Sequence, residues 1–148
     1  MSCRFLSIYL NRKHIFIKFD INLNCGSIFI DKSHFKQIII NLLSNSIHAS
    51  LENTEITISA ARNENEIVLC IRDRGKGIPE ENLERVFNPF FTTEENGTGL
   101  GLSVVQGLVL KNHGHIWIQS KSGIGTTVNL AFSFDFAHFE RYYDKAIT

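Results

Sequence analysis

The sequence has no excess of charge, few cysteines and no long hydrophobic run, and each shortage excludes a class of protein. The formal net charge of its 148 residues is zero, which removes the electrostatic basis for binding nucleic acid or an anionic membrane surface. The three cysteines, Cys3, Cys25 and Cys70, are far apart; they fit neither a zinc motif nor a disulfide framework and favour a reducing compartment. The apolar run at residues 5–10 is too short for a signal-peptide core or a membrane span. We therefore expect no nucleic-acid partner and no membrane segment in this chain.

What remains is the composition of an ordinary globular domain, with 43% hydrophobic and 20% charged residues. Alternating apolar residues predict strands at 14–21, 27–30, 55–61, 66–73, 115–120 and 126–134. Helical spacing predicts helices at 33–50, 80–87 and 100–112. This order favours an α+β fold, a two-layer sandwich of a mixed, mostly antiparallel sheet with about three helices on one face. We expect one domain over residues 1–134 and a tail at 135–148, where a short helix is predicted from Ala137.

The helix predicted at 33–50 has an unusual polar face. Its apolar stripe is regular, whereas Gln37, Asn41, Asn45 and His48 share another face at three- or four-residue spacing. Asparagine is a mediocre helix former, so two of them one turn apart are not typical of a solvated surface. A carboxamide oxygen can bind Mg²⁺ and a carboxamide N–H can bind phosphate. The face is therefore either plain solvated surface or part of a metal and phosphate site.

The stretch Asp73-Arg-Gly-Lys-Gly follows the strand predicted at 66–73 directly. It could be a solvated turn in which Asp and Gly serve the backbone geometry. Alternatively, Asp73 at the end of a central strand could accept a hydrogen bond from an exocyclic amine such as that of adenine. Gly75 and Gly77 would then let the backbone pass close to a flat ring, which a Cβ would obstruct.

A second glycine-rich stretch, Gly-Thr-Gly-Leu-Gly-Leu at 97–102, opens the helix predicted at 100–112. Backbone N–H groups and the helix dipole make such an N-terminus an anion site. No strand immediately precedes it, so it is not a dinucleotide fingerprint, and it lacks the Gly-Lys-Ser or Gly-Lys-Thr of a P-loop. Gly101 and Gly107 lower helix propensity and predict close backbone approach. Residues 88–99, dense in Thr, Gly and Asn, predict a mobile loop.

Five motifs now stand in one order: Asn41-x-x-x-Asn45, Asp73-x-Gly-x-Gly77, Asn88-Pro-Phe-Phe-Thr-Thr93, Gly97-Thr-Gly-Leu-Gly-Leu102 and Gly123-x-Gly-Thr126. In that order they resemble the ATP-binding catalytic domain of two-component sensor histidine kinases, in the superfamily of type II topoisomerases, Hsp90 and MutL. The resemblance covers roughly residues 14–131 and is nearest to the nitrogen-regulation type. It implies a Bergerat-type ATP-binding fold, with ATP and Mg²⁺ as cofactors.

The resemblance also implies a role for each matching position. Asn45 would bind Mg²⁺ and Asn41 would support it, both as catalytic residues, while Asp73 would bind the adenine amine. Phe90 and Phe91 would anchor the lid over the nucleotide. The full set of implied nucleotide-binding residues is Asn41, Asn45, His48, Asp73, Gly75, Gly77, Ile78, Phe90, Thr93, Gly97, Thr98, Gly99, Leu100, Gly101, Leu102 and Thr126.

The sequence departs from the family pattern at two places near the expected phosphates. His48 stands where Lys or Asp is familiar, and Glu94 and Glu95 follow the Thr-Thr pair where a Lys often stands. Two carboxylates there should repel a triphosphate unless the lid turns them outward. In addition, none of the six histidines lies in the family's phosphoacceptor motif.

We therefore expect the catalytic part of a sensor kinase, which transfers the γ-phosphoryl group of Mg-ATP to a histidine on a separate helical-hairpin domain, in cis or in trans. A response regulator would act downstream, and the protein would be cytoplasmic, alone or as part of a membrane-anchored sensor. A hydrolytic clamp lacks its general base, because Asn41 stands where those relatives carry Glu. A non-catalytic nucleotide-binding or interaction module remains the alternative.

Overall fold

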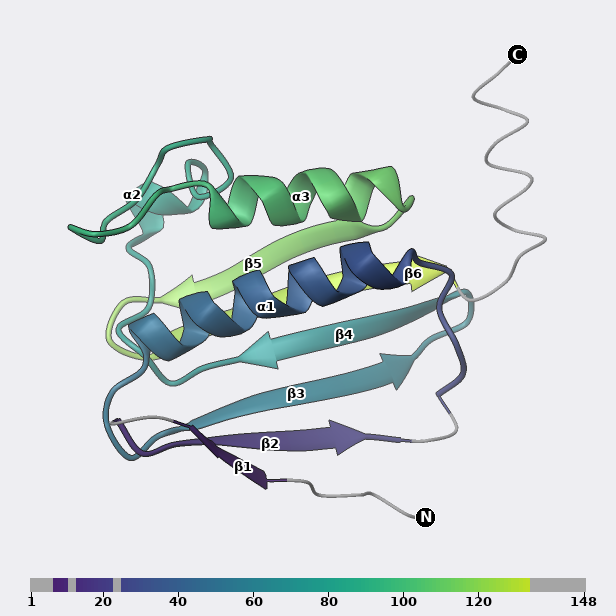
Figure 1. Ribbon diagram of the computed structural model, residues 1–148, viewed down its shortest axis with the longest axis horizontal. Helices are drawn as coiled ribbons and strands as arrows, with labels where there is room; N and C mark the ends of the chain where they lie inside the picture. The colour runs from purple at the N-terminus through teal and green to yellow at the C-terminus, as the bar shows by residue number, and fades with distance from the viewer. Residues whose placement is uncertain (1–6, 11–12, 23–24, 134–148) are drawn as a thin grey trace.

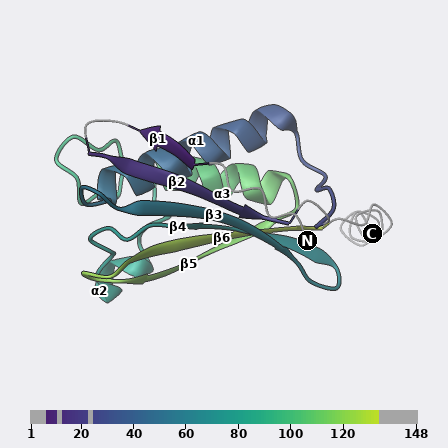
Figure 2. The same cartoon turned by 90° about the horizontal axis from the view of Figure 1, so that it is seen from below.

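The computed structural model describes residues 7–10, 13–22 and 25–133, which form one sheet with helices packed on one face (Figures 1 and 2). The strands are β1 Ser7–Leu10, β2 Ile15–Ile21, β3 Glu55–Arg62, β4 Glu66–Arg72, β5 His115–Lys121 and β6 Gly125–Ser133. The helices are α1 Lys32–Ala49, α2 Glu80–Leu83 and α3 Gly101–Lys111. In the described part of the chain, no helix is long and apolar enough to cross a membrane.

The sheet has six strands in the order β1-β2-β3-β4-β6-β5. Only β2 and β3 are parallel, because α1 carries the chain back between them; the other neighbours are antiparallel. Figure 2 shows α1 and α3 on the same side of the sheet, whereas the short α2 lies beside β5. The predicted α+β sandwich with a mixed, mostly antiparallel sheet is confirmed, and two of its three helices cover the sheet.

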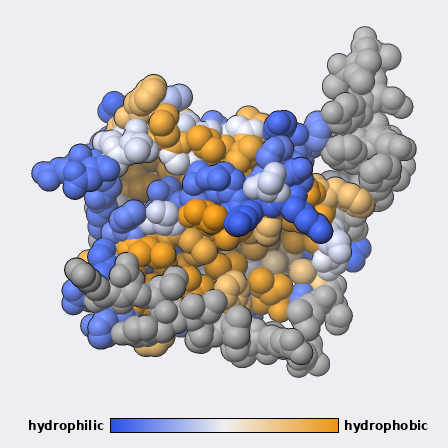
Figure 3. Space-filling view, viewed as in Figure 1, coloured by the Kyte–Doolittle hydropathy of each residue, from blue (hydrophilic) through white to orange (hydrophobic). Residues whose placement is uncertain are grey.

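The core lies between the sheet and these two helices. From α1, Ile38 and Leu42 are fully buried, and the rest of the predicted apolar stripe packs around them half-buried. Val105 and Val109 of α3 are equally buried and belong to the same core cluster as buried side chains of α1, β3, β4 and β6. This packing, more than helix propensity, holds both helices on the sheet. It also leaves the opposite, polar face of α1 open, which Figure 3 shows as hydrophilic surface over that helix.

Local signals fix where the helices begin and end. The Asp31 carboxylate caps α1 by accepting the N–H groups of Ser33 and His34 at 2.8 and 3.0 Å. At the end of α3, Gly114 N–H donates to Val109 O and His113 N–H to Leu110 O, which is a Schellman motif. His113, with φ of 58°, takes the left-handed position. Gly114 is needed for a different reason: a Cβ there would lie 2.6 Å from the ring of Phe132.

Several predicted elements differ from the structure. Strand β1 was not predicted, and residues 27–30 are not a strand: they pair with none of the six strands, and Ile28 and Ile30 pack half-buried against the core. The helix predicted at 80–87 ends at Leu83; Arg85 and Asn88 continue it as turns with bonds to residues three earlier. The tail predicted at 135–148 lies outside the described residues.

Candidate functional site

A cleft of about 870 Å³ opens between α1, the start of α3, the loop after β4, and residues 88–99, which we call the lid. Its walls thus come from segments that are far apart in the sequence. Figure 3 shows the surface hollowed between α1 and the lid side of the molecule. Every motif identified in the sequence contributes to this one cleft.

The polar face of α1 forms one wall. Asn41, Asn45 and His48 all line the cleft, and the Asn41 carboxamide is held at both ends. Its oxygen accepts the Gln37 side-chain N–H at 2.9 Å, and its nitrogen donates to Gly101 O at 3.4 Å. A Cβ added to Gly101 would lie 3.6 Å from Asn45 Oδ1, so both carboxamides face the first residue of α3.

That end of α3 is free of any cap. Leu100 is the N-cap residue, no side chain among the described residues caps the helix, and its first turn holds no acidic residue. The N–H groups of a helix's first turn have no partner within the helix. Gly101 and Leu102 of this turn line the cleft, and the positive end of the helix dipole favours an anion there.

Asp73 lies at the floor of the cleft, at the end of β4, and is only 4% exposed. The N–H groups of Gly75 and Thr126 donate to the same oxygen, Oδ1, at 2.9 and 3.2 Å. Burial raises the pKa of this carboxyl, while the bonds from Gly75, Thr126 and the Ser46 hydroxyl act in the opposite direction. Because the amides are bound to Oδ1, the geometry orients the carboxylate and directs Oδ2 to other donors.

A second set of hydrogen bonds connects Thr126 to Ser120 and to the loop after β4. Thr126, 8% exposed, has its hydroxyl 2.7 Å from Ser120 Oγ. Ser120 Oγ also accepts the Ile78 N–H at 2.8 Å and donates to Gly125 O at 3.0 Å. Thr126 therefore reaches Asp73 through its backbone N–H, and its hydroxyl is bound to Ser120.

Gly75 and Gly77 are required for packing against the protein itself. A Cβ on Gly75 would lie 2.2 Å from Ala49 O, at the end of α1, and one on Gly77 would lie 2.0 Å from Lys121 O. Gly77 also has φ of 69°, which favours glycine. Gly77 lines the cleft and Gly75 does not. The structure brings only Gly77 to the cleft, because α1 fills the space beside Gly75. The expected place of the two glycines in a base pocket stays a prediction.

The lid is closed at its stem by a backbone bond from Phe90 N–H to Gly99 O at 2.8 Å. Phe91 points into the cleft, with the Arg85 guanidinium 4.5 Å from its ring centroid. Phe90, by contrast, is 76% exposed and does not line the cleft. Of the two predicted lid anchors, only Phe91 has its side chain there.

The remaining predicted residues can now be placed. Lining the cleft are Asn41, Asn45, His48, Asp73, Gly77, Ile78, Thr93, Gly97, Thr98, Gly99, Gly101, Leu102 and Thr126. Gly75, Phe90 and Leu100 do not line it. Gly107, expected to allow close backbone approach, has no atom within 4 Å of an added Cβ and is exposed.

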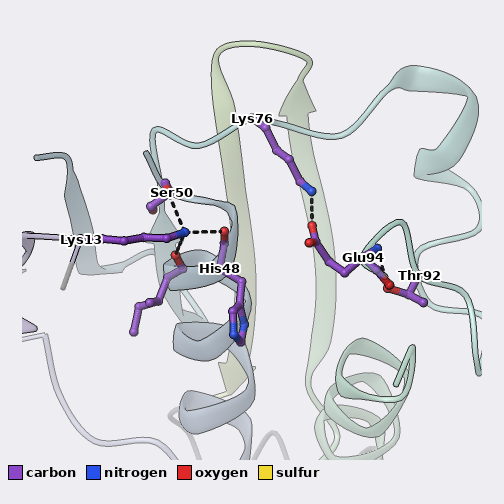
Figure 4. A network of polar contacts seen from close by, with 7 residues as sticks. Lys13, His48, Ser50, Lys76, Thr92 and Glu94 are labelled. Atoms are coloured by element: carbon purple, nitrogen blue, oxygen red, sulfur yellow. Dashed lines mark hydrogen bonds and ion pairs between the residues drawn. The ribbon is translucent and has the colours of Figure 1, made fainter. Parts of the chain in front are cut away.

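Ser46 and Lys76 are two of the lining residues that were not predicted. Ser46, 4% exposed, occupies a position in the apolar stripe of α1 and binds Asp73; a small polar residue four positions after Leu42 was its only signal. Lys76 forms an ion pair with Glu94 of the lid, as Figure 4 shows. Nothing in the sequence pairs these two residues, because they are 18 positions apart and lie in two separate loops.

The donor set fits Mg²⁺ only in the company of a ligand. No group of three His, Cys, Asp or Glu side chains that could hold a metal occurs among the described residues. Mg²⁺ commonly takes one or two protein oxygens and completes its shell with phosphates and water. The Asn45 carboxamide beside the start of α3 matches that requirement.

Comparison with known proteins agrees with this geometry. Residues 30–136 match the family model described as histidine kinase-, DNA gyrase B- and HSP90-like ATPase. The sensor histidine kinase ZraS of Escherichia coli (strain K12) is 33% identical over 129 residues, 87% of this chain and 28% of that protein. Sporulation kinase C of Bacillus subtilis (strain 168) is 35% identical over 96 residues, 65% of this chain and 22% of that protein.

Solved structures with a similar fold also include a histidine kinase domain. The catalytic domain of histidine kinase ThkA superposes with a TM-score of 0.73 at 31% identity, covering 82% of each chain. The chain spans about a quarter of the length of the two curated relatives. With a family model matched over most of its length, the chain belongs to the histidine kinase-, DNA gyrase B- and HSP90-like ATPase family.

Proposed function

We propose that this chain binds Mg-ATP and transfers its γ-phosphoryl group to a histidine of a separate phosphoacceptor domain. The observation that carries the proposal is the uncapped start of α3 beside Asn41 and Asn45, in a cleft whose floor holds Asp73. One end of this cleft favours an anion, and the other offers a buried acceptor. A nucleotide has matching groups, with phosphates at one end and a base that carries an amine donor at the other.

The adenine end would be read by Asp73. A buried carboxylate with Oδ1 fixed by two backbone amides can accept the exocyclic amine of adenine on Oδ2. An acceptor left without its donor in a buried site costs about 1–3 kcal/mol. Bases that present a carbonyl in place of the amine would therefore be rejected.

The phosphate end would be held by the first-turn N–H groups of α3 and by the lid. Asn45 would supply the protein oxygen for Mg²⁺, and Asn41, already fixed by Gln37 and Gly101, would hold the phosphates in place. Bound there, Mg²⁺ would neutralise charge that develops on the transferring group. The chain's own part is to bind, orient and exclude water.

Transfer to a histidine is favoured over hydrolysis by the residue at position 41. A carboxamide has no basic group with which to activate water, so the site lacks a general base there. The relatives are named sensor and sporulation kinases, and by analogy the acceptor would be a helical-hairpin domain, with a response regulator downstream. The cytoplasmic location expected from the sequence stays a prediction.

The test is to incubate the chain with γ-labelled ATP and Mg²⁺, with and without a helical-hairpin acceptor domain from a related kinase. We expect acid-labile phosphohistidine on the acceptor and little free phosphate. Free phosphate without phosphohistidine would favour an ATPase. Nucleotide binding without either product would favour the non-catalytic module.

A further inference from the structure

The ion pair between Lys76 and Glu94 crosses the mouth of the cleft (Figure 4). Lys76 lies in the loop after β4 that also carries Asp73 and Gly77, while Glu94 belongs to the lid. Both residues line the cleft, and their side chains are 50% and 48% exposed. The contact thus joins the lid to the opposite wall and can be reached by solvent and by a ligand.

The two partners are held differently. The backbone of Lys76 is fixed on both sides, because its N–H donates to Ala49 O at 3.1 Å and its carbonyl accepts the Gly123 N–H at 2.6 Å. Glu94 lies in a local turn of the lid, where its N–H donates to Thr92 Oγ1 at 3.0 Å and its carbonyl accepts the Gly97 N–H at 3.2 Å. Lys76 is therefore the stationary partner, and the turn at 92–97 presents Glu94 to it.

The location of the Glu94 carboxylate favours negative charge. The bond from Lys76 is the main cause that lowers the pKa of Glu94, and the charges of Lys76, His48 and Lys13 lower it further. Lys13 is itself fixed, since its Nζ donates to the carbonyls of His48 and Ser50 at 3.1 and 3.2 Å (Figure 4). Lys76 is thus the cation that contacts Glu94, while His48 and Lys13 add only a more distant attraction.

We propose that Lys76 is a phosphate-binding residue of this cleft, and that Glu94 takes the place of a nucleotide phosphate on Lys76 while the cleft holds no nucleotide. A phosphate carries more negative charge and more acceptor oxygens than a carboxylate, and an exposed ion pair is weak. The phosphate therefore displaces Glu94, which turns away from Lys76. The identity of this anion rests on the proposed function, whereas the ion pair itself does not.

This exchange explains a departure from the family pattern. Glu94 stands where a cation is common, and as a free carboxylate it would repel the triphosphate. Paired with Lys76, Glu94 competes with a nucleotide phosphate for that ammonium group. It therefore lowers the affinity for nucleotides that carry phosphate and leaves recognition of the base unchanged.

The experiment compares Glu94→Gln, Lys76→Gln and the double variant by calorimetry with Mg-ATP and with adenosine. Removing the competitor should tighten Mg-ATP binding by roughly two- to fivefold, the range of an exposed ion pair. Lys76→Gln should weaken it, and Glu94→Gln should then have no further effect in the Lys76→Gln background. Adenosine has no phosphate and should bind all four proteins equally.

Glu95→Gln is the matched control, because Glu95 is adjacent, lines the same cleft and takes part in neither ion pair found among the described residues. An equal gain in Glu95→Gln, or an undiminished Glu94→Gln gain in the absence of Lys76, would mean a general charge effect and would overturn the proposal.

A nucleotide-free readout separates this inference from the proposed function. Hydrogen exchange at residues 92–97 should be faster in both Glu94→Gln and Lys76→Gln than in the unchanged protein, and unchanged in Glu95→Gln. Equal exchange in all four proteins would overturn the ion-pair part, whatever the nucleotide results. A native chain that binds no Mg-ATP would refute the proposed function and the phosphate part together, leaving the exchange result to decide the ion pair alone.

Discussion

At the scale of single residues, Asp73 shows how a site is built from groups that also hold the fold. The Oδ1 atom of Asp73 joins the loop after β4 to β6 through the amides of Gly75 and Thr126. Because the carboxylate is buried, leaving its Oδ2 atom without a donor would cost free energy. The same carboxylate can thus be structural on one side and recognise a ligand on the other.

The substitution Asp73→Asn tests whether this carboxylate recognises the adenine amine. Asparagine keeps an oxygen for the two amides but presents an N–H₂ group on the other side, which opposes the adenine amine. We expect Mg-ATP to bind roughly tenfold or more weakly, since about 1.4 kcal/mol is a factor of ten. Calorimetry measures this, with Asp20→Asn, an exposed substitution on β2, as the control. Unchanged affinity would remove Asp73 from the nucleotide site.

The raised pKa of Asp73 gives a pH dependence of known sign. The folded state binds this proton more tightly than the unfolded chain, whose pKa is 3.8, so Asp73 lowers the free energy of unfolding as pH rises through that window. Adenosine binding should change in the opposite sense and weaken as pH falls through the raised pKa, because only the carboxylate accepts the amine. Both trends should vanish in Asp73→Asn, as measured by calorimetry and denaturant unfolding across pH.

Asn45 should matter for phosphoryl transfer and little for folding. It is exposed on the open face of α1 beside Gly101, so Asn45→Ala removes the proposed Mg²⁺ ligand without opening a cavity. We expect no detectable transfer to a competent acceptor and a free energy of unfolding within about 0.5 kcal/mol of the original. Lys36→Ala, also exposed on α1, should keep transfer. A folded Asn45→Ala protein that still transfers phosphate would refute the role.

At the scale of elements, α3 carries glycines for different reasons at its two ends. Gly101 brings the start of the helix to the carboxamides of α1, and Gly114 lets the chain pass Phe132 after the helix ends. Gly107 lies between them with open space around an added Cβ. Its glycine is therefore explained by neither packing nor the cleft.

Gly107→Ala should stabilise the protein by about 0.8–1 kcal/mol, because alanine restores helix propensity without steric cost. Gly114→Ala should do the opposite, since its Cβ would lie 2.6 Å from the Phe132 ring. Denaturant unfolding with constant slope gives both values. Destabilisation by Gly107→Ala would show that a contact at this position has been overlooked.

At the scale of the whole molecule, the two layers bring together residues that enter the chain far apart. The loop after β4 rests on the end of α1 through Lys76 N–H and Ala49 O, and on the β5–β6 turn through Lys76 O and Gly123 N–H. The start of α3 meets the middle of α1 through Asn41 and Gly101. These three contacts hold the walls of the cleft next to one another.

One consequence for the whole chain is that it should not phosphorylate itself. Among the histidines that the structure describes, His48 is the one that lines the cleft, and it lies in the last turn of α1 on the cleft wall. In-line transfer needs a nucleophile opposite the leaving oxygen at about 3–3.5 Å, which a side chain on that wall cannot reach. We expect no acid-labile phosphate on the pure chain after incubation with Mg-ATP, as checked by mass spectrometry. Phosphate mapped to one of its own histidines would contradict this.

The local sequence was sufficient for the elements with strong periodicity. The apolar stripe through Ile38 and Leu42 predicted α1, and alternation predicted β2 to β6. Most of the residues that motif spacing selected also line the cleft. Apolar periodicity and capping are properties of neighbouring residues, so they can be read without knowing what packs against them.

Tertiary structure decided what depends on partners distant in sequence. Residues 27–30 alternate like a strand, yet they pair with none of the six strands, and Ile28 and Ile30 pack against the core instead. Phe90 and Phe91 are adjacent, but only Phe91 turns into the cleft. The sequence by itself determined α1, α3 and the strands β2 to β6, and it selected the motifs that the fold brings to one cleft. The packing of α1 and α3 on the sheet determined why Gly75 must be glycine and which cation Glu94 meets, because steric exclusion and ion pairing act between atoms that only the fold brings together.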